Sequence, residues 1–353
     1  MSVTDLTASL PDRGFGFAGT ARFEVRRCIG AGGMGVVYEA FDRERHATVA
    51  LKTLRSLSPD ALLRFKREFR DFLDLAHPNL ISLGELFSEG QDWFFTMELV
   101  DGLPFLDWIR PEQLGFERPT PPSISPSAAT LPDLKPRGLR GGGKVAPIDV
   151  PRLRSALAQL TEGLMALHAA DKVHRDIKPS NVLFDPTTGT VKVTDFGSAR
   201  VADTAATRSG VMLGTPAYMA PEQLAGADAT AQCDLYALGV LLFELLIGRR
   251  PFEADSMGDL LARIAHQQPP SVRALRPELP PLLDDIVTRL LAKSPGLRQD
   301  NAHQVALELR LARQQCAAAE PGSAAAEWPD TAAGHDPLNN PTASHPFQGT
   351  IAS

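Results

Sequence analysis

The run His174-Arg-Asp-Ile-Lys-Pro-Ser-Asn181, followed closely by Asp195-Phe-Gly197, is the most informative part of this chain. Between the two runs lie Val-Leu-Phe, a polar turn and Val-Lys-Val-Thr, which predict two short strands joined by a hairpin. The hairpin would hold the carboxylates of Asp176 and Asp195 and the amide of Asn181 on neighbouring loops. Such a set suits phosphoryl transfer from a magnesium nucleotide, because one group orients the attacking hydroxyl and the others hold the metal.

A glycine-rich run, Gly30-Ala-Gly-Gly-Met-Gly-Val-Val37, lies nearer the N-terminus. On its own this spacing is weak evidence, because a dinucleotide-binding turn has a similar pattern but requires a helix after it. Here the strand-like residues Val36 to Phe41 follow. The context therefore favours a glycine hairpin between two strands, which can fold over phosphates and donate backbone N–H groups.

Lys52 lies on the next expected strand, Thr48 to Thr53, at a distance from the glycine hairpin that would place its ammonium over the phosphates. Glu68, on an expected helix over residues 60–76, is the natural carboxylate to aim this lysine. The plainer alternatives are a solvated lysine and an exposed helix charge, and the residues alone leave both readings open.

The composition is ordinary for a soluble globular protein, since 43% of the 353 residues are hydrophobic and 22% are charged. A net charge of -6 does not suggest nucleic-acid binding. The three cysteines fit neither a zinc site nor a disulfide framework. We see no secretion signal, and the longest apolar run, Leu235 to Ile247, is too short to span a bilayer. We therefore expect a cytoplasmic protein with no membrane span and no nucleic-acid partner.

Strand-like and helical patterns divide the chain into two regions. Strands are expected from about Phe23, over Leu80 to Phe87 and over Trp93 to Glu98, whereas the pattern from Asp149 onward is mainly helical. Between these regions, residues 111–144 are rich in Pro, Ser and Gly and predict a disordered insertion. Whether this insertion recruits a partner or is only a solvated loop stays open.

These motifs together resemble a eukaryotic-type serine/threonine protein kinase of the bacterial kind. The match runs from about Phe23 to about Leu311, and the motifs come in the family's order. They are the glycine loop, Val49-Ala-Leu-Lys52, the helix glutamate, His-Arg-Asp with Asn181, Asp-Phe-Gly, and Ala220-Pro-Glu222.

The resemblance implies an α+β, bilobal protein-kinase fold, with a small antiparallel-sheet N-lobe, a mainly helical C-lobe and ATP between them. The expected boundaries are a flexible leader over 1–22, a kinase domain over 23–315 and a disordered C-terminal tail over 316–353. Within the domain, the N-lobe would span 23–98, the C-lobe 101–315 and the insertion 111–144.

The resemblance also implies a role for each matching residue. Asp176 would orient the substrate hydroxyl and accept its proton, and Lys178 would neutralise the moving phosphoryl group. Lys52 would contact the phosphates and pair with Glu68, while Asn181 and Asp195 would hold Mg²⁺. Met97 would back the adenine pocket, and no carboxylate is evident for the ribose. The positions implied around ATP are Ile29, Gly30, Gly32, Gly33, Gly35, Val37, Ala50, Lys52, Met97, Glu98, Val100 and Leu183.

Further residues match the family's supporting positions. Glu222 would form a buried ion pair with Arg298, and Asp234 would cap the apolar helix that follows it and hold the backbone of the catalytic loop. His174 and Phe196 are interpreted as packing and alignment residues rather than as acid/base groups.

Substrate class and regulation are implied by the same resemblance. Lys178 and Thr215 match the serine/threonine branch of the family. Arg175 would bind a phosphorylated residue in the segment 195–222, and we expect autophosphorylation at Thr207 or Ser209. The alternative is a flexible polar loop.

Two other functions compete with an active protein kinase. A pseudokinase scaffold usually lacks one of Lys52, Asp176 or Asp195, and this chain has all three. A small-molecule phosphotransferase of similar fold seldom keeps the segment that ends in Ala220-Pro-Glu222. The complete set of motifs therefore favours a kinase acting on proteins.

Overall fold

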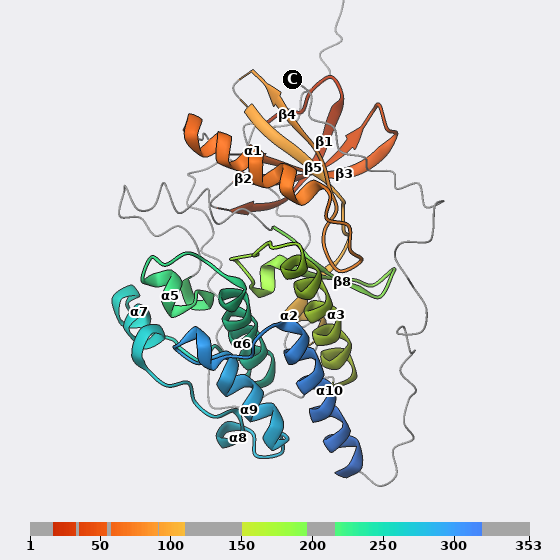
Figure 1. Cartoon of the computed structure of the whole chain (residues 1–353). Helices are drawn as coiled ribbons and strands as arrows, with labels where there is room; N and C mark the ends of the chain where they lie inside the picture. The colour runs from red at the N-terminus through yellow and green to blue at the C-terminus, as the bar shows by residue number, and fades with distance from the viewer. Residues whose placement is uncertain are drawn as a thin grey trace, which may run out of the picture.

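The protein consists of a sheet with one helix packed against its face and a group of helices below them (Figure 1). The computed structural model describes residues 17–32, 35–54, 58–90, 92–109, 150–195 and 216–319. We call the part up to Met97 the N-lobe and the part from Asp101 onward the C-lobe. This architecture confirms the predicted α+β, bilobal fold.

A five-stranded antiparallel sheet, in the order β1-β2-β3-β5-β4, forms the N-lobe. The fourth strand begins at Leu83 rather than at Leu80 as predicted, because residues 80–82 turn toward the C-lobe instead. The strands are β1 (Phe23–Gly32), β2 (Gly35–Asp42), β3 (Ala47–Leu54), β4 (Leu83–Glu89) and β5 (Asp92–Met97).

Helix α1 (Pro59–Leu73) packs against one face of this sheet. It begins after Ser58, whose side chain accepts a hydrogen bond from the N–H of Ala61, and it has proline at its first position. Phe65 and Phe69, one turn apart, both contact Phe95 of β5, with ring centroids 5.8 and 5.3 Å away. The helix ends before the predicted residue 76.

The opposite face of the sheet carries a smaller apolar cluster around Tyr38, Leu51 and Phe94. Phe17 covers this cluster, with its ring 5.0 Å from that of Phe94. It lies within the segment 1–22 for which we expected a flexible leader. The sheet is therefore covered on both faces.

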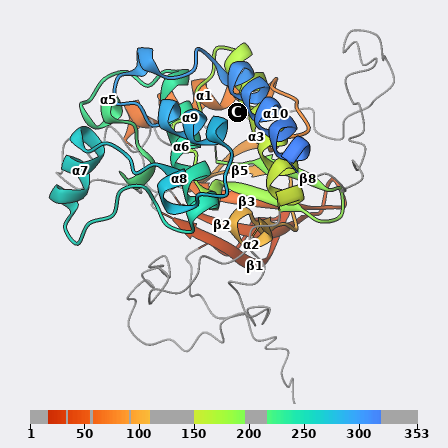
Figure 2. The same ribbon diagram turned by 90° about the horizontal axis from the view of Figure 1, so that it is seen from below.

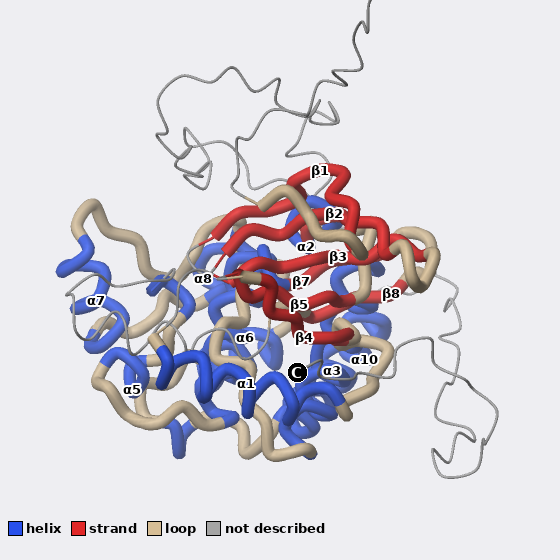
Figure 3. Tube along the Cα trace, turned by 90° about the horizontal axis from the view of Figure 1, so that it is seen from above, coloured by secondary structure: helices blue, strands red, loops and turns tan. Residues whose placement is uncertain are grey.

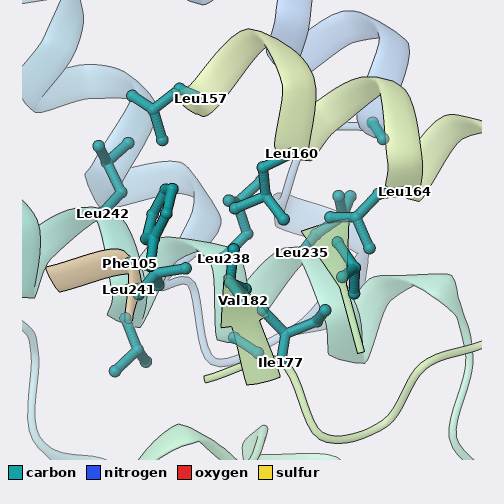
Figure 4. Close-up of a cluster of buried hydrophobic side chains, with 14 of the residues drawn as sticks. Phe105, Leu157, Leu160, Leu164, Ile177, Val182, Leu235, Leu238, Leu241 and Leu242 are labelled. Atoms are coloured by element: carbon teal, nitrogen blue, oxygen red, sulfur yellow. The ribbon is translucent and has the colours of Figure 1, made fainter. Parts of the chain in front are cut away.

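The C-lobe is built around α6 (Ala231–Ile247), which is buried along nearly its whole length because almost every position is apolar. Figure 4 shows leucines of α3 (Val150–Ala169) and α6 pointing toward a common centre with Ile177 and Val182. In the view from below, the C-lobe helices lie in front of the N-lobe sheet (Figure 2). The other helices are α2 (Phe105–Ile109), α5 (Pro221–Leu224), α7 (Met257–His266), α8 (Val272–Leu275), α9 (Pro281–Leu290) and α10 (Ala302–Ala319).

A second sheet of three short strands belongs to the C-lobe, and the view from above shows it under the N-lobe sheet (Figure 3). Strands β7 (Val182–Asp185) and β8 (Thr190–Val193) form the hairpin that the sequence predicted. The third strand is β6 (Leu103–Pro104). This hairpin places Asn181 before its first strand and Asp195 after its second.

Helix α10 continues to Ala319, so the first residues of the predicted tail 316–353 are helical. The rest of that tail and the predicted insertion 111–144 lie outside the described residues. In the part of the chain that is described, no helix has both the length and the apolar character required to cross a membrane.

Candidate functional site

Three predicted site residues meet on the loop that precedes β7. The ammonium of Lys178 donates to Oδ2 of Asp176 at 2.6 Å. The amide of Asn181 donates to the same oxygen at 3.0 Å and to the carbonyl of Asp176 at 2.8 Å. Asn181 is buried, whereas the side chain of Asp176 is 21% exposed. The Asp176 carboxylate is thus held from one side and remains accessible from another.

Asp234 of α6 anchors the backbone of this loop. One of its carboxylate oxygens accepts the N–H of Arg175 and the other accepts the N–H of His174, each at 2.8 Å. The carboxylate is fully buried, and His168 of α3 lies 2.9 Å from it. The predicted role in holding the loop is confirmed. The predicted helix cap is wrong, because α6 begins four residues earlier, after Thr230.

The ring of His174 links the loop to the strand hairpin. Its Nδ1 accepts the N–H of Asp176 at 3.2 Å, so the proton of a neutral ring lies on Nε2, 2.9 Å from the carbonyl of Thr194. The ring is fully buried. This geometry aligns Asp176 with the strand that leads to Asp195, as expected for an alignment residue.

Asn181 and Asp195 offer oxygen atoms of the kind that Mg²⁺ prefers. Because the Asn181 amide nitrogen is bonded to Asp176, its Oδ1 faces away from that carboxylate. Asp195 has a left-handed backbone with φ of 64°, a conformation that is uncommon for aspartate and frequent at functional sites. One carboxylate and one amide suit Mg²⁺, which usually keeps waters and substrate phosphates as its other ligands.

The lysine of the N-lobe has a different partner from the one expected. Lys52 Nζ lies 2.8 Å from Oδ1 of Asp195, and Glu68 instead lies 3.6 Å from the guanidinium of Arg175. The predicted Lys52–Glu68 ion pair is therefore not formed. The reason is that each side chain has a second possible partner in the C-lobe. Lys52 pairs with Asp195 instead of Glu68, and Glu68 pairs with Arg175 instead of Lys52.

The lower face of the N-lobe sheet carries the residues predicted around the adenine. Val37 is paired with Lys52, and Ala50 is paired with Met97, so that these positions alternate onto one face. Ala50 and Met97 are buried. Leu183 of β7, paired with Pro104, lies below in the C-lobe. These residues are placed on both sides of the lobe boundary.

The glycine loop is a hairpin, as predicted. Gly30 pairs with Val37 and Gly32 pairs with Gly35, while Ile29 lies at an irregularity in the register and is 39% exposed. A Cβ on Gly35 would lie 1.7 Å from the carbonyl oxygen of Thr53, so only glycine fits there. Gly33 lies outside the described residues.

The connection between the lobes runs through Glu98, Leu99 and Val100. The N–H of Glu98 donates to the carbonyl of Ser82 at 2.9 Å. Among the described hydrogen bonds, none uses the carbonyl of Glu98 or the N–H and carbonyl of Val100. Backbone groups are therefore free at the positions predicted to bind the adenine edge.

The predicted ion pair of the C-lobe is confirmed. The two terminal guanidinium nitrogens of Arg298 donate to Glu222, at 2.6 and 2.8 Å. The side chain of Arg298 is fully buried. Burial alone would raise the pKa of Glu222, but the hydrogen bond from Arg298, a backbone hydrogen bond and the charge of Arg298 together outweigh it and hold that pKa below its usual value.

One charged residue of this region was not singled out from the sequence. Lys192 of β8 forms an ion pair of 2.9 Å with Glu98. Its position in the sequence could have indicated a role, because this lysine lies between two buried valines and three residues before Asp195. Phe196 and the candidate phosphorylation sites Thr207 and Ser209 lie outside the described residues.

Comparison with known proteins agrees with this geometry. The protein kinase domain family matches residues 23–307 of the chain. The chain is 33% identical to the serine/threonine-protein kinase PknA of Mycobacterium tuberculosis over 289 residues, covering 79% of this chain and 58% of PknA. It is 30% identical to PrkC of Bacillus subtilis over 297 residues, covering 83% of this chain and 41% of PrkC. The chain thus spans about half the length of these relatives.

A solved structure has the same fold. The kinase domain of Mycobacterium tuberculosis PknI matches with a TM-score of 0.59 and 23% identity, covering 83% of this chain and 96% of that domain. This likeness extends over both lobes.

Proposed function

This chain belongs to the protein kinase domain family, and from this premise we propose that it is an ATP-dependent serine/threonine protein kinase. It would transfer the γ-phosphoryl group of Mg-ATP to the Ser or Thr hydroxyls of protein substrates. The observation that carries the proposal is the cluster of Asp176, Lys178 and Asn181, joined by hydrogen bonds on a loop that is anchored to buried α6.

Asp176 is the base in the proposed reaction. The hydroxyl oxygen of the substrate attacks the γ-phosphorus, the bond from phosphorus to the bridging oxygen breaks, and ADP leaves with that oxygen. Asp176 orients the hydroxyl and accepts its proton. Lys178, 2.6 Å from Asp176, would neutralise the moving phosphoryl group.

The nucleotide would lie between the N-lobe sheet and Leu183. Lys52 would contact the α- and β-phosphates, with the glycine hairpin above them. The carbonyl of Glu98 and the backbone of Val100 would bind the adenine edge. Asn181 and Asp195 would hold Mg²⁺, which neutralises the phosphates when it is bound. The other residues proposed around ATP are Ile29, Gly30, Gly32, Gly33, Gly35, Val37, Ala50 and Met97.

Autophosphorylation at Thr207 or Ser209 is part of the proposal. A phosphate brings about two negative charges at neutral pH and would pair with Arg175. Arg175 now lies 3.6 Å from Glu68, so a phosphate would compete with that carboxylate. We also propose that the kinase acts in the cytoplasm.

The test is incubation of the purified chain with Mg-ATP and a generic basic protein, followed by mapping of phosphorylated residues. Asp176→Asn removes the base, and Asp171→Asn is the matched control, because Asp171 is an exposed aspartate on the same segment. We expect phosphoserine or phosphothreonine with the wild type and with Asp171→Asn only.

Two results would contradict the proposal. If the wild-type chain binds Mg-ADP but phosphorylates neither itself nor the basic protein, the chain is a nucleotide-binding scaffold. If active enzyme leaves Thr207 and Ser209 unmodified, the proposed sites of autophosphorylation are wrong.

A further inference from the structure

Lys192 and Glu98 form an ion pair between the strand that leads to Asp195 and the connection between the lobes. The Lys192 ammonium lies 2.9 Å from each oxygen of the Glu98 carboxylate. The two side chains are only 13% and 29% exposed. Glu98 Oε2 also accepts the N–H of Ser82 at 3.2 Å. The carboxylate is therefore fixed by a cation and by a backbone donor.

The two ends of this ion pair belong to different parts of the proposed nucleotide site. Glu98 is the first residue after β5, and its carbonyl is one of the groups proposed to bind adenine. Lys192 is three residues before Asp195, the residue proposed to hold Mg²⁺. The ion pair thus joins the base end of the site to its phosphate end.

Backbone hydrogen bonds connect the same two ends through residues 79–82. Glu98 N–H donates to Ser82 O, Ile81 N–H donates to Val193 O, and Val193 N–H donates to Asn79 O, each at 2.9 Å. This row fixes the spacing between β8 and the connection. These backbone bonds do not fix how Glu98 is turned about the line that they form. The ion pair between the side chains of Glu98 and Lys192 limits that rotation.

We propose that Lys192 is a positioning residue for nucleotide binding, which through Glu98 sets the orientation of residues 98–100 relative to Asp195. The inference rests on the proposed function, since it concerns the same nucleotide site. Without the ammonium, the Glu98 carboxylate keeps the bond to the N–H of Ser82 but loses its fixed direction, so residues 98–100 no longer hold the adenine in the best orientation relative to the phosphates.

The experiment measures binding of a fluorescent ADP analogue with Mg²⁺ to the full chain. We expect Lys192→Met to weaken binding about 5- to 20-fold, which lies within the range of coupling between neighbouring groups in one network. Lys192→Arg should retain most of the affinity, because a guanidinium can still pair with Glu98. The control is Lys172→Met, which removes a more exposed lysine paired with Asp71 and should bind like the wild type.

A double-mutant cycle tests whether the two residues act as one unit. In Glu98→Gln the side-chain oxygen can still accept the N–H of Ser82, so this variant should fold. If the pair positions the nucleotide, Lys192→Met and Glu98→Gln should weaken binding similarly, and the double variant should be no worse than either. In kinetic assays the KM for ATP should rise while the KM for the protein substrate stays unchanged.

The outcomes separate this inference from the proposed function. If the wild type binds no ADP analogue, both are overturned. If the wild type binds and phosphorylates but the variants bind with unchanged affinity, only the positioning role is overturned. A fall in melting temperature without a change in affinity would make the ion pair a purely structural contact.

Discussion

Lys293 carries a cation into a largely apolar part of the C-lobe. Its ammonium lies 4.0 Å from the ring centre of Phe252 and donates to the carbonyl of Ile264 at 2.6 Å. Burial, together with the positive charge of Arg298, lowers the pKa of Lys293 from 10.5 to about 8. Lys293 therefore links the end of α7 to the segment after α9. When the ammonium is charged, its burial reduces the stability of the folded chain.

The lowered pKa predicts a stability that depends on pH. Between about pH 8 and 10 the unfolded chain binds more protons than the folded one, so the free energy of unfolding rises with pH in this window. We expect a gain of roughly 1 kcal/mol, because the side chain is only partly buried. Urea unfolding of the wild type and Lys293→Met at several pH values checks this. A rise of equal size in both proteins would rule out Lys293 as its source.

At the scale of elements, α6 holds the loop that contains His174 and Arg175 through one carboxylate, that of Asp234. Asp234→Asn would place an amide N–H against one of the two backbone N–H groups that the carboxylate now accepts. We expect a loss of about 2–3 kcal/mol in the free energy of unfolding, together with a fall in kcat. Urea unfolding and kinase assays measure both, with exposed Asp228→Asn as the control. Unchanged stability would mean that the loop holds its shape without α6.

The Glu222–Arg298 ion pair joins α5 to the segment before α10. Arg298→Met leaves the Glu222 carboxylate half-buried without its main partner, which should cost about 3–5 kcal/mol. Combining it with Glu222→Gln removes the stranded charge, so the double variant should be more stable than Arg298→Met alone. Thermal unfolding of the three proteins checks the order. A double variant with the full additive loss would contradict this account.

At the scale of the whole molecule, a nucleotide bound between the lobes should stabilise the entire chain. Mg-ADP at 100 times its Kd should add about 2.7 kcal/mol to the free energy of unfolding. Lys52→Met should lose most of this effect, because in the proposed complex Lys52 would contact the phosphates. Asp176→Asn should keep it, because in the proposed complex Asp176 would face the hydroxyl substrate instead. Melting curves with and without Mg-ADP test the prediction, and equal shifts in both variants would contradict it.

Features set by neighbouring residues were the most predictable from the sequence. Asp176, Lys178 and Asn181 lie within six positions of one another, so a single turn brings them together. The hairpin of β7 and β8 followed from two short apolar runs and a polar turn. Glu222–Arg298, distant in sequence, was predicted only because the family motif supplied it.

Features set by the placement of one lobe on the other were not predictable. The partner of Lys52 depends on how α1 lies relative to the C-lobe, since Glu68 and Asp195 come from different lobes. Leu80 and Ile81 look like the start of a strand because they are apolar, but Val193 of the C-lobe competes with β5 for their backbone. Lys192 was overlooked because a lysine on a strand is usually solvated.

The row of hydrogen bonds from residues 79–82 to β8 connects the two lobes more firmly along this line than elsewhere on their boundary. A lobe that is bonded to its neighbour along one line can rotate about that line but cannot slide relative to the other lobe. Opening and closing of the N-lobe would then be a hinge rotation about this line, and the glycine hairpin, at the free edge of the lobe, would travel farthest. Within α1, the end next to this line would move less than the first turn, which follows Ser58.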